Sequence, residues 1–342
     1  MSRKITSKDI ARRANVSQAT VSYVLNNAPG KSISEHTRKR VLDAVAELNY
    51  IPNSAAKRLK SNRSYCIAVR LGTTLNMPRY YNAMQGIRSY LEPRGYNILL
   101  CNDQERGNTY NFIDTYLNTQ TDGVIYVSSN HSDIPPDALE QINTHNIPFS
   151  TIDCMSENPT ISSVRYDYFA SSYQRADYLL NKGFKKFIYI RPSYENAKET
   201  ARERGFKAVV LGQDNLSYEI ISIGGIDANS SMFSQNNFSF EPDISDIQMI
   251  KNIVNSAPLD TCFICSSREV QKILSDRLYI QHLTLQSPET QNWFDRSVSY
   301  HFSHYSAGTE AARSLLNIIN NKDEVRKITL QPILEPVDPS IY

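Results

Sequence analysis

The sequence predicts a small three-helix amino-terminal domain followed by a larger α/β core of two parallel-sheet subdomains. The chain has 342 residues, enough for two or three domains. Residues 1–63 hold 13 Lys and Arg against 4 Asp and Glu, whereas the remaining residues hold 24 against 31. After residue 64, short apolar segments alternate with amphipathic ones, a pattern that predicts parallel sheets covered by helices on both faces. A basic segment on an acidic body is typical of a nucleic-acid-binding arm.

Capping residues mark the starts of three short helices near the amino terminus. Thr6 and Asp9 have the spacing of a capping box, so the first helix should begin there. The pattern breaks around Asn15, and Ser17 can cap a second helix. Ser34 can cap the third.

The apolar residues of these helices predict how they pack. In the second helix, Val21, Val24 and Leu25 repeat at helical spacing and should face inward. The third helix has a predicted buried stripe of Val41, Leu42, Val45 and Leu48. Two short helices around a tight turn, packed on a third, form a helix-turn-helix, the unit that many repressors insert into the DNA major groove.

Residues 53–64 predict a short hinge helix and linker. Pro52 cannot continue the preceding helix, and Asn53 can cap a new one. A helix of about two turns is marginal in water, so it should form only when something holds it. Ala56 and Leu59 share one face, and the neighbouring Lys57 can reach phosphates. A plain basic linker is the alternative.

Here the sequence closely resembles the LacI/GalR family of bacterial transcription regulators. The likeness covers DIARRANVSQATVSYVLN and TRKRVLDAVAELNYIPNSAAKRL, including the V-S-x-x-T-V-S turn at residues 16–22 and the N-Y-I-P-N junction at 49–53. It implies that the second helix reads base edges and that Leu59 wedges between base pairs in the minor groove. The DNA-contacting residues implied are Thr6, Ser17, Gln18, Ala19, Thr20, Ser22, Tyr23, Asn26, Asn53, Ala56, Lys57 and Leu59.

The body of the chain predicts two sheets. Strands are expected at 66–69, 96–100, 123–127, 149–152, 187–190, 218–223 and 261–265. Helices between them include 79–91, 169–183, 244–254 and 306–320. The expected domains are 1–52 (helix-turn-helix), 53–64 (hinge) and 65–342 (core), with subdomain 1 at about 65–164 and 295–325 and subdomain 2 at about 165–294 and 326–342. A ligand would bind between them, near the carboxyl ends of strands.

The resemblance extends into the core, which looks like the periplasmic-binding-protein-like core of the same family. The R-x-x-G-F segment that begins at Arg202 matches a helix whose arginine commonly contacts the effector. Asp153 and Asp167 fall where relatives carry acidic residues near the cleft. The implied effector contacts are Asp153, Asn196 and Arg202, although Arg202 could instead pair with a carboxylate on its helix.

The likeness fades after about residue 215, which leaves the input signal open. Relatives carry an Asn-Asp pair after the strand that matches TCFIC, whereas this chain has Ser266 and Ser267. The stretch HLTLQSPET lacks a further family aspartate. Carboxylates and amides suit sugar hydroxyls, so the loss of these positions argues against a common free sugar as the effector. Three alternatives remain: a different ligand, a protein corepressor, or no effector.

Other site types lack support in the sequence. No G-x-S-x-G, P-loop, H-E-x-x-H or G-x-G-x-x-G occurs, so we expect no enzyme activity and no cofactor. His301-x-x-His304 lacks a third ligand nearby, and Cys262-x-x-Cys265 has no second pair, so no metal site is expected. The odd number of cysteines fits a reducing cytoplasm. The first residues contain no apolar segment, so we expect no secretory signal. The sequence contains no long apolar run, so we expect no membrane-spanning segment.

The sequence therefore predicts a DNA-binding transcription regulator, most simply a repressor. It should bind double-stranded operator DNA of pseudo-palindromic sequence as a homodimer, with helix 79–91 and its surroundings as a dimer face. The core should sense a small-molecule effector of unknown identity, with a sugar or sugar derivative as one candidate. An enzyme carrying a DNA-binding arm and a regulator controlled by a protein partner, with a vestigial cleft, are the alternatives.

Overall fold

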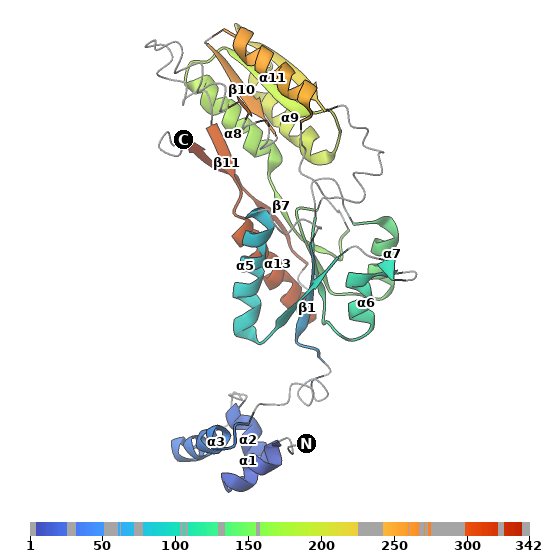
Figure 1. The fold of residues 1–342 in the computed structure, drawn as a ribbon, viewed down its shortest axis with the longest axis vertical. Coiled ribbons are helices and arrows are strands. Elements are labelled where there is room, and N and C mark those ends of the chain that lie inside the picture. Colours follow the sequence, from blue (N-terminus) through green and yellow to red (C-terminus); the bar gives the residue numbers. More distant parts are fainter. Residues whose placement is uncertain are drawn as a thin grey trace. The chain divides into compact units, whose positions relative to one another are not determined.

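A computed structural model of the chain forms two compact units, Met1–Ser64 and Tyr65–Tyr342. It describes residues 5–25, 32–50, 61, 63–71, 78–102, 105–106, 109–128, 134–154, 158–224, 242–258, 260–266, 270, 273–274, 298–320 and 325–336 (Figure 1). Five predicted DNA contacts lie outside these ranges, namely Asn26, Asn53, Ala56, Lys57 and Leu59.

The amino-terminal unit contains the three predicted helices, α1 (Ser7–Arg13), α2 (Gln18–Leu25) and α3 (Glu35–Glu47). The backbone N–H of Thr6 donates to the Asp9 carboxylate at 2.9 Å, as the capping box requires. The Ser17 hydroxyl accepts from the N–H of Thr20 at 3.1 Å and starts α2. The Ser34 hydroxyl accepts from the N–H of Thr37 at 3.2 Å and starts α3. The three predicted caps are confirmed.

The core of this unit follows the predicted helical spacing with one exception. Ile10, Val21, Val24 and Val41 are buried together. Leu42 was predicted to join them, and this is wrong, because 48% of its surface is exposed. On a helix, residues 41, 44, 45 and 48 lie along one side, and residue 42 lies about 100° away from residue 41. Ala44 takes the buried position instead.

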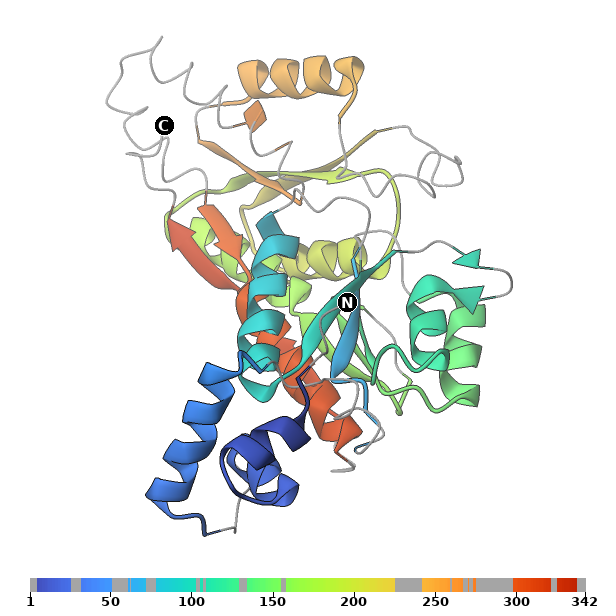
Figure 2. The ribbon, with the colours of Figure 1, turned by 60° about the horizontal axis from the view of Figure 1, so that its bottom comes forward.

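Subdomain 1 is built on a six-stranded parallel sheet in the order β12-β7-β6-β5-β1-β2. Its strands are β1 (Cys66–Arg70), β2 (Asn97–Cys101), β5 (Val124–Val127), β6 (Phe149–Ile152), β7 (Ser162–Tyr166) and β12 (Lys327–Leu330). Helices α5 (Pro78–Leu91) and α13 (His304–Ile319) cover one face, and α6 (Asn111–Leu117) and α7 (Pro136–Thr144) cover the other (Figures 1 and 2). Along β1, Ile67 and Val69 face α5 and α13, whereas Ala68 faces α6.

Short elements connect these layers. The 3₁₀ turn η1 (Glu92–Arg94) follows α5 and leads into β2. The two-residue strands β3 (Glu105–Arg106) and β4 (Thr109–Tyr110) form an antiparallel pair before α6.

Subdomain 2 is built on a three-stranded parallel sheet in the order β10-β8-β9. Its strands are β8 (Lys186–Pro192), β9 (Ser217–Ile223) and β10 (Thr261–Cys265). Helices α8 (Tyr168–Asn181) and α9 (Ala197–Val210) pack on one face, where Phe187 and Tyr189 point. Helix α11 (Ile244–Ser256) packs on the other face, against Ile190 (Figure 2). The α/β fold of two parallel-sheet subdomains is therefore as predicted.

Within the described residues, three segments cross between the subdomains. Strand β7 leads into α8, and β11 (Val298–His301) leads into α13. Strand β12 leads into β13 (Ile333–Pro336), which pairs with β11 as an antiparallel ribbon beside α8. The predicted boundaries differ from this at the carboxyl end, where 326–342 was assigned to subdomain 2. Lys327–Leu330 pairs with β7 and completes the sheet of subdomain 1.

Glycines allow close helix pairs in both subdomains. A methyl group on Gly308 of α13 would lie 2.0 Å from the carbonyl oxygen of Ala83 on α5. A methyl group on Gly86 of α5 would lie 2.0 Å from the carbonyl oxygen of Tyr305. A methyl group on Gly205 of α9 would lie 2.2 Å from the carbonyl oxygen of Phe169 on α8. The backbones of these helices touch directly, so no side chain larger than hydrogen fits at the crossing points.

In the parts of the chain that the structure describes, no helix has both the length and the apolar character needed to cross a lipid bilayer.

Candidate functional site

The outward face of α2 carries the predicted reading residues. Gln18, Ala19 and Tyr23 are exposed, and Tyr23 has 37% of its surface accessible. The Gln18 amide nitrogen donates to the Ser7 hydroxyl at 3.4 Å, so the end of this side chain lies beside the first turn of α1. Ser22 is half-buried. On the opposite side, Val21 and Val24 are buried as predicted, and Leu25 is half-buried.

Polar contacts join α1 and the turn that follows it to α3. Asn15 has φ 49°, a left-handed conformation that asparagine tolerates, and it reverses the chain between α1 and α2. Arg40 of α3 donates to the Asn15 carbonyl oxygen at 2.9 Å. Arg13 of α1 pairs with Glu47 of α3 at 2.6 Å. These contacts hold together the two helices against which the buried side of α2 packs.

Thr6, Ser17 and Thr20 lie at the helix starts of this unit. Thr6 is exposed and donates its hydroxyl to Asp9 at 2.7 Å. The Ser17 and Thr20 hydroxyls lie 2.9 Å apart. Helix starts are where backbone N–H groups and hydroxyls can bind phosphate, so this position suits contacts to the DNA backbone.

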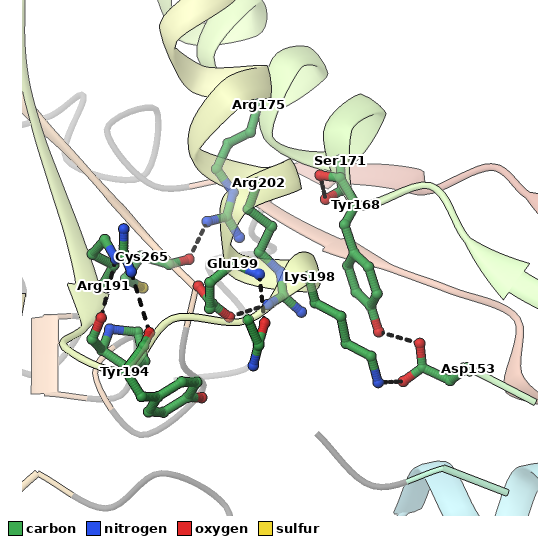
Figure 3. A network of polar contacts seen from close by, with 12 residues as sticks. Asp153, Tyr168, Ser171, Arg175, Arg191, Tyr194, Lys198, Glu199, Arg202 and Cys265 are labelled. Atoms are coloured by element: carbon green, nitrogen blue, oxygen red, sulfur yellow. Dashed lines mark hydrogen bonds and ion pairs between the residues drawn. The ribbon is translucent and has the colours of Figure 1, made fainter. Parts of the chain in front are cut away.

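The second candidate site is a cluster at the junction of the two subdomains, which we call the junction cluster: Asp153, Tyr168, Lys198, Glu199 and Arg202 (Figure 3). Asp153 directly follows β6 and has φ 61°. Its carboxylate accepts from the Tyr168 hydroxyl at 2.8 Å and from Lys198 Nζ at 2.9 Å. Burial and the charge of Asp153 hold the pKa of Tyr168 well above its usual value of 10. Tyr168 therefore stays protonated, and its hydroxyl donates a hydrogen bond to the carboxylate.

The two other predicted effector residues lie at the N-cap and in the second turn of α9. The Asn196 side chain caps this helix, because its oxygen accepts from the N–H of Glu199 at 2.8 Å. Arg202 forms an ion pair with Glu199 on the same helix, and its guanidinium lies 4.1 Å from the ring centre of Tyr168. Of the two alternatives for Arg202, the structure contains the pairing with a helix carboxylate. Asp153 and Arg202 come together because both touch Tyr168.

Sequence reasoning missed Lys198 and the charged pairs around it. Lys198 lies four residues before Arg202, so both occupy one face of α9. That spacing was the signal in the sequence that could have indicated Lys198. However, two basic residues on one face of a helix usually indicate a face exposed to solvent. Further along α9, Glu203 pairs with Arg191 of β8 and with Lys207. Asp167, also predicted near the cleft, instead caps α8 by accepting from the N–H of Ala170 at 2.9 Å.

Aromatic residues from two crossovers pack beneath this cluster. The rings of Tyr166 and Phe302 stack with centres 4.7 Å apart, and Tyr168 meets Phe302 edge to face at 5.5 Å. The Tyr166 hydroxyl and His304 Nδ1 lie 2.6 Å apart. These contacts tie the start of α8 to the start of α13. Any rotation of one subdomain against the other must deform or roll over them.

We expect His304 to make the core less stable in mild acid. Burial lowers the pKa of His304 from 6.5 to about 4, and the neighbouring Asp153 offsets this in part. Between these pH values the unfolded chain binds a proton that the folded chain does not, so stability falls as the pH falls. The loss from pH 7 to pH 5 should be about 2 kcal/mol for this group.

Urea unfolding at pH 7 and pH 5 measures this loss. The His304→Gln variant, which does not titrate, should lose less stability than the unchanged protein over the same interval. An equal loss in both proteins would assign the acid sensitivity to carboxylates instead.

Comparison with known proteins places both sites in one family. The pattern described as bacterial regulatory proteins, lacI family, matches residues 6–53. The pattern described as periplasmic binding proteins and sugar binding domain of LacI family matches residues 70–251, more than half of the chain. The first match covers the three helices of the amino-terminal unit, and the second covers the junction cluster.

Individual relatives agree with this assignment. The HTH-type transcriptional regulator RegA of Clostridium saccharobutylicum is 34% identical over 190 residues, 55% of each chain, so the match spans about half of that relative. The HTH-type transcriptional repressor PurR of Actinobacillus pleuropneumoniae serotype 5b (strain L20) is 26% identical over 339 residues, 96% of this chain and 94% of PurR. The structure of the Lac repressor dimer bound to operator and the anti-inducer ONPF shares the fold, with a TM-score of 0.68, 18% identity and coverage of 97% of this chain and 98% of that chain. The chain belongs to the LacI family of bacterial regulatory proteins.

Proposed function

We propose that this DNA-binding transcription regulator is a repressor that binds a pseudo-palindromic operator as a homodimer. The exposed face of α2 carries the proposal, because Gln18 can pair bidentately with adenine and Ala19 can contact a thymine methyl group. Tyr23 would contact a third base edge, and Ser17 and Thr20 would meet phosphates. A repressor of this kind works on the chromosome and therefore in the cytoplasm, and catalysis forms no part of the proposal.

The hinge completes the proposed DNA contacts. Residues 53–60 would fold on DNA, with Leu59 wedged between base pairs and Lys57 on phosphate. Two chains would be needed, one for each half-site. The core would hold them together, with α5 as a dimer face, since Tyr81 on its outer side has 61% of its surface exposed.

The effector would bind at the junction cluster. Asp153 directly follows the carboxyl end of β6, and Arg202, of opposite charge, lies in the second turn of α9, which follows β8. Ligands of such folds bind near the carboxyl ends of parallel strands. The core could adopt two conformations that differ in the angle between the subdomains. A ligand that binds one conformation more tightly than the other shifts the population toward it. The resulting movement at Ser64 would favour or prevent pairing of the two hinges.

A second candidate is control by a protein partner, with the junction cluster as a vestigial site. The observation that favours it is the internal pairing of Asp153 and Arg202 with residues of the chain itself. In that case small molecules would not change operator affinity.

Selection from a random duplex library with the full-length protein tests the proposal. We expect inverted repeats whose half-sites share one sequence, and two chains per duplex by mass photometry. The selected duplex placed at a promoter should lower transcription in vitro when the protein is added. An asymmetric site occupied by one chain would contradict the homodimer, and an unchanged or higher transcript level would contradict repression.

A further inference from the structure

An ion pair between Lys198 and Asp153 joins the two subdomains. Asp153 follows β6 of subdomain 1, and Lys198 lies in the first turn of α9 in subdomain 2. The Nζ–Oδ2 distance is 2.9 Å, and only 6% and 8% of the two side chains are exposed (Figure 3). The pair therefore occupies the position between the subdomains where the proposed effector would enter.

A ligand can enter here only if it replaces both partners of the pair. Separating two buried charges is strongly unfavourable when either is left without a group that compensates for the lost partner. Lys198 needs an anion or strong acceptor in place of Asp153. Asp153 needs a donor in place of Lys198, in addition to the hydrogen bond from Tyr168. A neutral ligand supplies the donor but leaves the ammonium group without a negative charge.

The surroundings favour the same combination of groups. Lys198 lies in the first turn of a 14-residue helix, whose N-terminus stabilises negative charge. The guanidinium groups of Arg202 and Arg191 have their own carboxylates, Glu199 and Glu203, so they do not neutralise Asp153. The second oxygen of Glu199 is buried and has no hydrogen-bond partner within the described structure. It can accept a hydrogen bond from a hydroxyl group.

We propose that Lys198 makes this site selective for ligands that carry an anionic group beside hydroxyl groups, such as a sugar phosphate or a sugar acid. The anion binds Lys198 at the start of α9, and the hydroxyls donate to Asp153 and Glu199. In the absence of such a ligand, Lys198 itself occupies Asp153 and keeps the subdomains in contact. This inference rests on the proposed effector site.

Isothermal titration of the full-length protein with glucose 6-phosphate, gluconate, glucose and inorganic phosphate tests the selectivity. An added charge-assisted hydrogen bond predicts that at least one of the two hydroxylated anions binds about ten- to a hundredfold more tightly than glucose. Inorganic phosphate should bind more weakly than that anion, because it lacks the hydroxyl groups that Asp153 needs. Lys198→Met should reduce the preference over glucose to about threefold or less.

Two further variants control for folding and for general charge. Lys207→Met removes a lysine from the same helix that pairs with Glu203 rather than Asp153, and the preference for the anion should persist. The double variant Asp153→Asn, Lys198→Met removes both charges, so it should melt at a higher temperature than Lys198→Met alone and should also lack the preference.

The possible outcomes separate this inference from the proposed function. If glucose binds the unchanged protein as tightly as the anions, or Lys198→Met keeps the preference, the inference is overturned and the effector site remains. If none of the four compounds binds the unchanged protein or the variants while operator selection succeeds, both the inference and the effector site fail, and the DNA-binding function stands.

Discussion

Gly308→Ala should destabilise the core by about 3 kcal/mol or more. The new methyl group would lie 2.0 Å from the carbonyl oxygen of Ala83, an approach that carbon and oxygen atoms cannot make. Because the obstacle is backbone of α5, no side-chain rotation relieves it, and α5 and α13 must move apart. This separation loosens the packing of Ile87 and Leu315 on the sheet. Urea unfolding followed by circular dichroism measures the change in the free energy of unfolding.

Gly183→Ala provides the comparison. Gly183 has φ +92°, and nothing lies within 4 Å of the added methyl group. Its substitution should cost about 1 kcal/mol, from backbone conformation alone. Equal destabilisation by Gly183→Ala and Gly308→Ala would show that α5 and α13 are not in backbone contact.

Gln18→Ala should lower affinity for the selected operator by roughly five- to 150-fold, which corresponds to one bidentate base contact. The side chain is exposed at the start of α2 and contributes little to the core, so folding should be unaffected. Because Gln18 is uncharged, affinity for random duplex DNA and the slope of affinity against salt concentration should stay unchanged. Fluorescence anisotropy with both duplexes at several salt concentrations separates these quantities.

Gln248→Ala removes an exposed glutamine from α11 and serves as the matched control, with no expected change on either duplex. An equal loss of affinity for operator and random DNA upon Gln18→Ala would assign Gln18 to the DNA backbone rather than to a base.

Local rules predicted the parts of the fold that depend on neighbouring residues. The caps at Thr6, Ser17 and Ser34 follow from side chains that reach backbone only three residues away. The strands at 149–152 and 261–265 have the predicted bounds. The apolar run of Cys262–Cys265 marks the second of them, and Phe149 and Ile152 frame the first.

The missed elements depend on partners far away in the sequence. Strand β7 contains Ser162 and Ser163, which are fully buried although they are polar, so no apolar run marks the strand. Strand β12 pairs with β7 across about 160 residues, which no local pattern encodes. Lys198 was missed for the same reason, since its burial depends on Asp153, 45 residues earlier. The sequence alone indicated Asp153 and Arg202 only through the family resemblance.

The order of strands and helices in subdomain 1 has a consequence for how the protein is made. Its sheet contains β1 near the start of the core and β12 near the end, and its helix layer pairs α5 with α13. A nascent chain can complete the three-helix unit soon after residue 50 leaves the ribosome, but it lacks α13 and β12 until translation has passed residue 330. Until then, the apolar face of α5 and the edge of β7 are uncovered. Chaperone dependence during translation should therefore concentrate in the core and not in the DNA-binding unit.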